Sequence, residues 1–218
     1  ALTKGDLVES RDIYFDTQMG NDALVPQSLD GWDILPNKAC FIIVDGSIPI
    51  IPDEVISTIT NYSYDKTVFL VARNFENAAV NTIMSINQHL KRPAMMPVKL
   101  PVSGTLGTAV MNDLATLLNT RTLFTVRDVK GADEIVVLDI PINLRANGLY
   151  ISKDNELVKE RSESILVGLD ERYNAMTVVE RANVVSRELA RRISRLRANN
   201  VTIRVTGVTS SDAKERHD

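Results

Sequence analysis

The sequence predicts an α/β fold: a mainly parallel sheet flanked by helices, with additional short strands and a C-terminal helical hairpin. Two observations carry this prediction. Between residues 39 and 125, short apolar runs alternate with segments of helical periodicity, an order typical of parallel α/β units. Residues 159–198 then show helical periodicity with one interruption, which indicates two consecutive helices. The 218 residues suffice for one large domain, or for one domain with a small appendage.

The first strand and helix cover residues 39–63. "ACFIIVD" is a continuous apolar run of the kind that a sheet buries on both faces. "PDEVISTITNYS" follows as a helix, with Pro52 in the first turn and the acidic Asp53 and Glu54 beside its positive end. The pair repeats as a strand "TVFLVA" and a helix over residues 77–88.

The third unit reads as an extended segment "AMMPVKL", a helix "GTLGTAVMNDLATLLN" and a strand "RTLFTV". Residues 133–154 predict the short strands "EIVVLDI" and "GLYISKD", with a turn at Asn147 and Gly148.

The C-terminal helices are separated by a break that contains "YNAMT". Thr177 and Glu180 have capping-box spacing at the start of the second helix. Asn199 and Asn200 are a plausible left-handed stop, and "VTIRVTG" follows as a strand. One face of the second helix is predicted to be apolar, formed by Val178, Ala182, Val185, Leu189, Ile193 and Leu196.

Composition excludes several classes of protein. The net charge is −3, which favours neither nucleic acid nor an anionic membrane as a partner, and no apolar run approaches the length of a membrane span. Cys40 is the only cysteine and lies inside an apolar run, so it is expected to be a core residue. The absence of a disulfide framework fits a reducing, cytoplasmic compartment.

Reactive side chains are few. His89 and His217 have no cysteine or second histidine at metal-ligand spacing. Asp45 and the glycine-containing helix entry at residues 103–110 lie where α/β enzymes often bind ligands, but the helix entry lacks a Walker lysine. The arginine-rich last helix carries interleaved glutamates, which favours a solvated face or an ion-pair network over nucleic-acid binding.

Two neighbouring helices carry more apolar surface than a sheet-covering helix needs. In the helix at 77–88 the apolar arc is roughly 160° wide, against about 100° for an ordinary stripe. Val80 and Met84 form its extra edge. In the helix at 52–63, Ile56 lies beside the stripe of Val55, Ile59 and Tyr62. The surplus indicates either a partner-binding groove between the helices or a deeper core.

At these residues the sequence resembles the apical domain of a group I (GroEL-type) chaperonin. The resemblance rests on an ordered series of segments, "ACFIIVDGSI", "KTVFLVARNFENAAVNTIM" and "MPVKLPVSGTLGTAVMNDLATLLNTRTLFT". The most similar stretch joins "VKLP" at residues 98–101 to "DLATL" at residues 113–117. The likeness is low in identity and covers most of the chain, which suggests a divergent viral (phage) or otherwise atypical member.

This resemblance implies a binding function rather than catalysis. An apical domain captures non-native polypeptide, and then a co-chaperonin lid, in an apolar groove between two helices above an extended segment. The groove residues implied by position are Met19, Ala23 and Leu24 in the extended segment, Val55, Thr58 and Ile59 on the first helix, and Val80, Ile83 and Met84 on the second. Thr58 and Ser85 replace apolar positions of the family, so the groove is expected to be shallower or more polar.

The resemblance also implies a domain division. Residues 12–198 correspond to the apical domain, and residues 1–11 and 199–218 to intermediate-domain segments, with hinges at Ser10, Asn199 and Asn200. The equatorial ATPase domain is expected outside this chain, so ATP and Mg are expected only in the full-length protein, which would assemble as a homo-oligomeric ring. Two alternatives remain: a small-molecule-binding α/β enzyme domain and a structural ring-assembly domain.

Overall fold

The computed structural model describes residues 10–19, 32–63, 65–145, 148–181, 183–198 and 201–202. A six-stranded sheet has the order β2-β6-β5-β4-β7, with β8 also paired to β4. Its strands are β2 (Gln18–Met19), β4 (Ala39–Ile48), β5 (Thr67–Phe75), β6 (Met95–Lys99), β7 (Thr122–Leu123) and β8 (Val136–Val137). The pairs among β6, β5, β4 and β7 are parallel, whereas β2 and β8 run antiparallel to their neighbours. This sheet confirms the predicted α/β class.

The apolar runs of this sheet are buried on both faces. In β4, Phe41 and Ile43 point to one core cluster, and Cys40, Ile42 and Val44 point to the other. All five side chains are at most 1% exposed. Because successive side chains of a strand alternate between faces, a strand covered on both sides needs a continuous apolar run.

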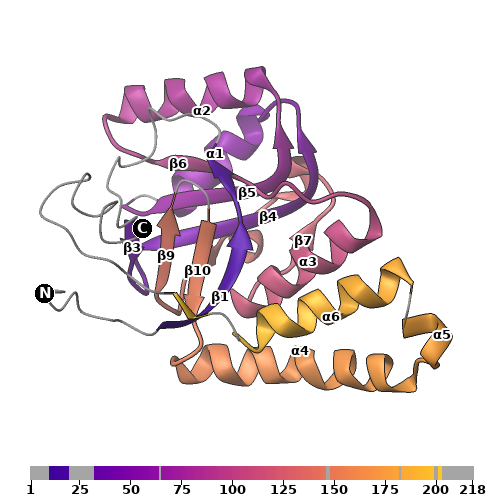
Figure 1. The fold of residues 1–218 in the computed structure, drawn as a ribbon. Coiled ribbons are helices and arrows are strands. Elements are labelled where there is room, and N and C mark those ends of the chain that lie inside the picture. The colour runs from indigo at the N-terminus through magenta and orange to yellow at the C-terminus, as the bar shows by residue number, and fades with distance from the viewer. Residues whose placement is uncertain are drawn as a thin grey trace, which may run out of the picture.

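Two helices cover one face of this sheet. They are α1 (Asp53–Tyr62), which follows β4, and α2 (Asn77–Leu90), which follows β5 (Figure 1). Pro52 caps α1 with an extended backbone, consistent with its restricted φ. Lys91 caps the C-terminal end of α2 with a left-handed backbone (φ 52°), and its N–H donates to the carbonyl oxygens of Asn87 and Gln88.

The opposite face is covered by α3 (Gly104–Leu117) and by a second, antiparallel sheet of order β11-β1-β10-β9-β3. Its strands are β1 (Ser10–Asp16), β3 (Trp32–Ile34), β9 (Ile142–Arg145), β10 (Gly148–Ser152) and β11 (Val201–Thr202). Residues of both sheets and of α3 belong to one core cluster. The central sheet therefore separates this large core from a smaller one beneath α1 and α2.

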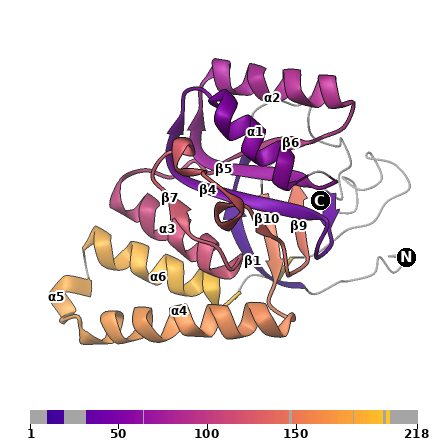
Figure 2. The same ribbon diagram turned by 180° about the vertical axis from the view of Figure 1, so that it is seen from behind.

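The C-terminal hairpin consists of α4 (Glu156–Ala175), the short α5 (Val178–Arg181) and α6 (Val184–Leu196). It lies on the α3 side of the molecule, at the end opposite to α2 (Figures 1 and 2). Arg192 of α6 holds both carboxylate oxygens of the buried Asp113 of α3, at 2.7 and 2.8 Å. This ion pair fixes the hairpin to the central unit.

Two predicted strands are shorter than expected. The segment "RTLFTV" forms only β7, after which Phe124 is 86% exposed and residues 126–128 turn as a 3-10 helix. In "EIVVLDI" only β8 is a strand, and the hairpin partner of β10 is β9, which the pattern did not predict. Asn147, in the predicted turn, lies outside the described residues.

The second helix of the hairpin is also divided. The Thr177–Glu180 capping box is present, with the Thr177 N–H donating to Glu180 Oε2 at 2.7 Å, but it caps only α5. α6 begins anew at Val184, capped by the Asn183 side chain. Leu189, Ile193 and Leu196 are buried as predicted, whereas Val178 and Val185 are 85% and 66% exposed. Among the described residues, no helix combines the length and apolarity needed to cross a membrane.

Candidate functional site

A groove lies between α1 and α2, with a cavity of about 580 Å³. Its lining residues are Ile56 and Thr60 from α1, and Asn81, Thr82, Ser85, Ile86, His89 and Leu90 from α2. The two helices follow neighbouring parallel strands, β4 and β5, so they lie side by side on one face of the sheet. The groove is thus a consequence of the α/β order that the sequence predicts.

The lining of this groove contains no Asp, Glu, Lys or Arg side chain, and His89 supplies an imidazole. The hydroxyl groups of Thr60, Thr82 and Ser85 donate to carbonyl oxygens of their own helices at 2.9 Å. Their hydrogen atoms are therefore already used, which lowers the polarity that the groove offers to a ligand. Ile56, Ile86 and Leu90 supply its apolar surface.

The groove continues into a second cavity of about 600 Å³ that shares Thr60 and Leu90 with the first. The additional lining residues are Asp65 and Arg92, so this end is charged. An extended chain lying along the two cavities would pass from a neutral surface to an ionic one.

Three of the predicted groove residues lie in the core. Val55, Ile59 and Ile83 are at most 1% exposed and pack against the central sheet. Their expected role as groove lining is therefore corrected: they lie beneath the helices and hold them on the sheet. The positions implied by the family resemblance did not distinguish the buried stripe of each helix from the flank that faces the neighbouring helix.

Thr58, Val80 and Met84 lie on other flanks of their helices and line neither cavity. Met84 is 37% exposed, and Thr58 and Val80 are half-buried. At about 100° per residue, Met84 and Ile86 point to nearly opposite sides of α2. The flank with Val80 and Met84 also carries Asn87, whose side chain bonds the backbone of Met95 at the start of β6. The surplus apolar edge of α2 therefore faces away from α1.

The remaining predicted positions are only partly described. Met19 lies in β2, whose backbone pairs with β6 opposite Val98, so the expected extended segment begins there. Ala23 and Leu24 lie outside the described residues, as do Asn199 and Asn200. Ser10, the other predicted hinge, lies in β1 opposite Thr202 of β11.

Sequence reasoning did not identify Thr60, Ile86 and Leu90 as groove residues. Ile86 packs partly against the core and also lines the groove. The available signal was Ile56, an apolar residue next to the main stripe of α1. Which flank of each helix faces the other follows from the β6-β5-β4 strand order.

The alternative enzyme site at the strand ends is filled by a side chain of the protein itself. Arg73 donates to Asp45 Oδ1 at 2.6 Å, to the Gly104 carbonyl at 3.1 Å and to Thr108 Oγ1 at 2.7 Å. Burial raises the pKa of the Cys40 thiol, which keeps it protonated. Within the described part of the chain, no group of three or more His, Cys, Asp or Glu side chains could hold a metal ion.

Comparison with solved structures relates this architecture to a chaperonin. The chaperonin gp146 from the bacteriophage EL 2 (Pseudomonas aeruginosa), crystallised in the presence of ATP-BeFx, superposes with a TM-score of 0.75 and 23% identity over 97% of this chain. The chain has a chaperonin fold. A second crystal form of gp146 gives a TM-score of 0.70 and 22% identity over 99% of the chain. The expected phage-chaperonin resemblance is thus confirmed at the level of fold.

The match covers only part of the relative. In both crystal forms the chain spans 41% of the length of gp146, which is the size of a domain rather than of a whole subunit. No protein-family model matches the sequence, and no curated protein matches it either. Comparison of structures therefore finds a similarity that the comparisons with family models and curated proteins do not.

Proposed function

We propose that this chain is the apical domain of a chaperonin and captures non-native polypeptide in the groove between α1 and α2. The observation that carries the proposal is the uncharged, partly apolar groove between two helices of a chaperonin fold. Its surface is lined by side chains and offers few free backbone donors or acceptors, because the backbone N–H and C=O groups of both helices bond within each helix. Recognition of this kind accepts many sequences, as a folding assistant requires.

The energetics suit weak, repeated capture. A client segment that buries about 300 Å² of apolar area gains roughly 7 kcal/mol before costs, at about 25 cal/mol/Å². Association and ordering of the client remove much of this gain, so a single groove binds weakly. A homo-oligomeric ring of such domains restores avidity, because several grooves hold one client at once.

The whole assembly extends beyond this chain. ATP hydrolysis is assigned to an equatorial domain outside residues 1–218, with residues 1–11 and 199–218 as intermediate-domain segments. This chain itself then acts by binding rather than catalysis, in the cytoplasm of a phage host. A co-chaperonin lid would compete with the client for the same groove.

Leu90→Ser tests the groove. Leu90 is 38% exposed at the junction of the two cavities, so its removal should cost about 1 kcal/mol of stability or less. Affinity for a permanently unfolded protein, such as a reduced and alkylated one, should fall several-fold in a direct binding assay. The matched control is Leu157→Ser, which changes a leucine that is 41% exposed on α4. Equal affinity of both variants for the unfolded protein would refute the proposed groove.

A further inference from the structure

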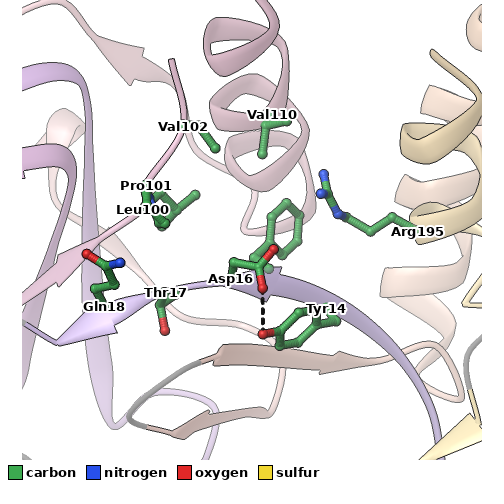
Figure 3. A pocket seen from close by; sticks show the side chains of 10 residues that line it. Tyr14, Asp16, Thr17, Gln18, Leu100, Pro101, Val102, Val110 and Arg195 are labelled. Atoms are coloured by element: carbon green, nitrogen blue, oxygen red, sulfur yellow. Dashed lines mark hydrogen bonds between the residues drawn. The ribbon is translucent and has the colours of Figure 1, made fainter. Parts of the chain in front are cut away.

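Two buried polar atoms without hydrogen-bond partners belong to residues of one cavity. In the described part of the chain, Thr17 Oγ1 and Arg195 Nη1 are the buried side-chain atoms that lack a partner. Both residues line a cavity of about 470 Å³ between the end of β1, the segment after β6, and helices α3 and α6 (Figure 3). Buried polar groups are nearly always paired, so the unpaired guanidinium nitrogen of Arg195 at this cavity indicates a missing partner. The cavity shares no residue with the groove between α1 and α2.

Arg195 is a cation without an ion-pair partner among the described residues. It reaches from α6 over the ring of Phe15, with its guanidinium carbon 5.4 Å from the ring centre. Burial lowers the pKa of Arg195, because the low-dielectric surroundings disfavour its charge. The nearby carboxylate of Asp113 is already held at both oxygens by Arg192.

Asp16 is the carboxylate at the rim of the cavity, and it does not pair with Arg195. Its Oδ1 accepts a hydrogen bond from the Tyr14 hydroxyl at 2.7 Å, and its side chain is exposed (Figure 3). No ion pair joins Asp16 to Arg195. Its exposure lets water screen its charge, so it repels a single negative charge near Arg195 only weakly.

Part of the remaining wall of the cavity is apolar, whereas Tyr14 and Gln18 add polar groups to it. Leu100, Val102 and Val110 lie across from Asp16 and Arg195 (Figure 3). A guanidinium group binds a carboxylate through two parallel hydrogen bonds, and an apolar wall accommodates a hydrocarbon body. Inorganic phosphate would bring more charge than one arginine neutralises and no apolar part.

We propose that this cavity binds a carboxylate group on an apolar body, with Arg195 as the recognising cation. The carboxylate is supplied either by a small organic acid or by an acidic side chain of a second copy of this chain. The site is separate from the client groove, and carboxylate binding there does not depend on whether the groove binds clients.

The test uses the 15N-labelled 218-residue chain and follows the Nε–H resonance of Arg195 by NMR. The probe is 3-phenylpropanoate, with the neutral 3-phenylpropanamide and inorganic phosphate as comparisons. We expect a saturable shift with the carboxylate, and at least tenfold weaker binding of the amide and of phosphate. Arg195→Gln should weaken carboxylate binding by at least tenfold. Arg187→Gln, which removes an exposed arginine from the same helix, should not.

Sedimentation velocity separates the two sources of the carboxylate. Self-association of the parent chain that is lost in Arg195→Gln and kept in Arg187→Gln assigns the carboxylate to a second copy and supports the site. The proposal is overturned if the parent shows neither a saturable carboxylate shift nor Arg195-dependent association. It is also overturned if Arg195→Gln binds 3-phenylpropanoate as tightly as the parent. If Arg195→Gln does not fold, equal affinity of the parent for carboxylate and amide overturns it.

Discussion

Adjacent residues of α2 have opposite environments. Ile83 is fully buried on the central sheet, whereas Met84, the next residue, is 37% exposed. The helical turn of about 100° per residue moves one side chain from the core to the flank. At this scale, hydrophobicity alone does not distinguish a core residue from a surface one, because both residues are apolar.

The pair Ile83→Ser and Met84→Ser tests this assignment. Ile83→Ser should lower the free energy of unfolding by about 2–5 kcal/mol, because it leaves a cavity and buries a hydroxyl. Met84→Ser should lower it by about 0.5 kcal/mol, as surface substitutions usually do. Urea unfolding followed by circular dichroism measures both values. A larger loss for Met84→Ser than for Ile83→Ser would contradict the orientation of α2.

At the scale of elements, polar side chains decide how the hairpin attaches. Arg161 of α4 donates to the Leu117 carbonyl at the end of α3. It also donates to both carboxylate oxygens of Asp139, which lies in the segment between β8 and β9. Together with the Arg192–Asp113 pair, this contact joins α3, α4 and α6. Removing one partner of a buried ion pair lowers the stability of the fold strongly, because the remaining charge stays buried without a partner.

Asp139 should make stability depend on acid pH. Hydrogen bonding to Arg161 lowers the pKa of Asp139 in the folded state below its usual value of about 3.9. Its contribution is therefore present above pH ~4 and is lost as the pH falls through the folded-state pKa. Asp139→Asn should be less stable than the parent at pH 7 and should lose less stability between pH 5 and pH 3. Unfolding free energies measured across this range would contradict the assignment if both proteins showed the same slope.

At the scale of the whole molecule, one core joins segments that are far apart in the sequence. The larger cluster contains residues of both sheets and of α3, α4 and α6. β1 pairs with β10 in the middle of the antiparallel sheet and with β11 at its edge. The two ends of the described chain therefore lie side by side.

Limited proteolysis should cut this protein first near its two ends. We expect the first cleavages near or outside Ser10 and Asn199, and a protected fragment between them, because the intervening segments share a core. Mass spectrometry of the early fragments identifies the cut sites. An early cut within residues 39–125 would contradict both the shared core and the proposed domain boundaries.

The elements that could be predicted from the sequence are those whose signals are local. The apolar runs of β4 and β5, the helices that follow them and the Thr177–Glu180 capping box were all readable from neighbouring residues. Such signals depend on burial and on hydrogen bonds within a few residues, so they can be recognised before the fold is known. They also indicated that α1 and α2 carry surplus apolar surface and lie beside each other.

Which surfaces face one another became clear only from the folded structure. The strand order β6-β5-β4 turns Ile56 and Ile86 toward the groove and leaves Met84 on the other flank. The second sheet pairs Ser10–Asp16 with Gly148–Ser152. Arg192 forms an ion pair with Asp113, although the two residues are 79 positions apart in the sequence. The cavity at Arg195 likewise joins β1, α3 and α6. These contacts depend on how distant segments pack together, which the periodicity of a single segment does not record.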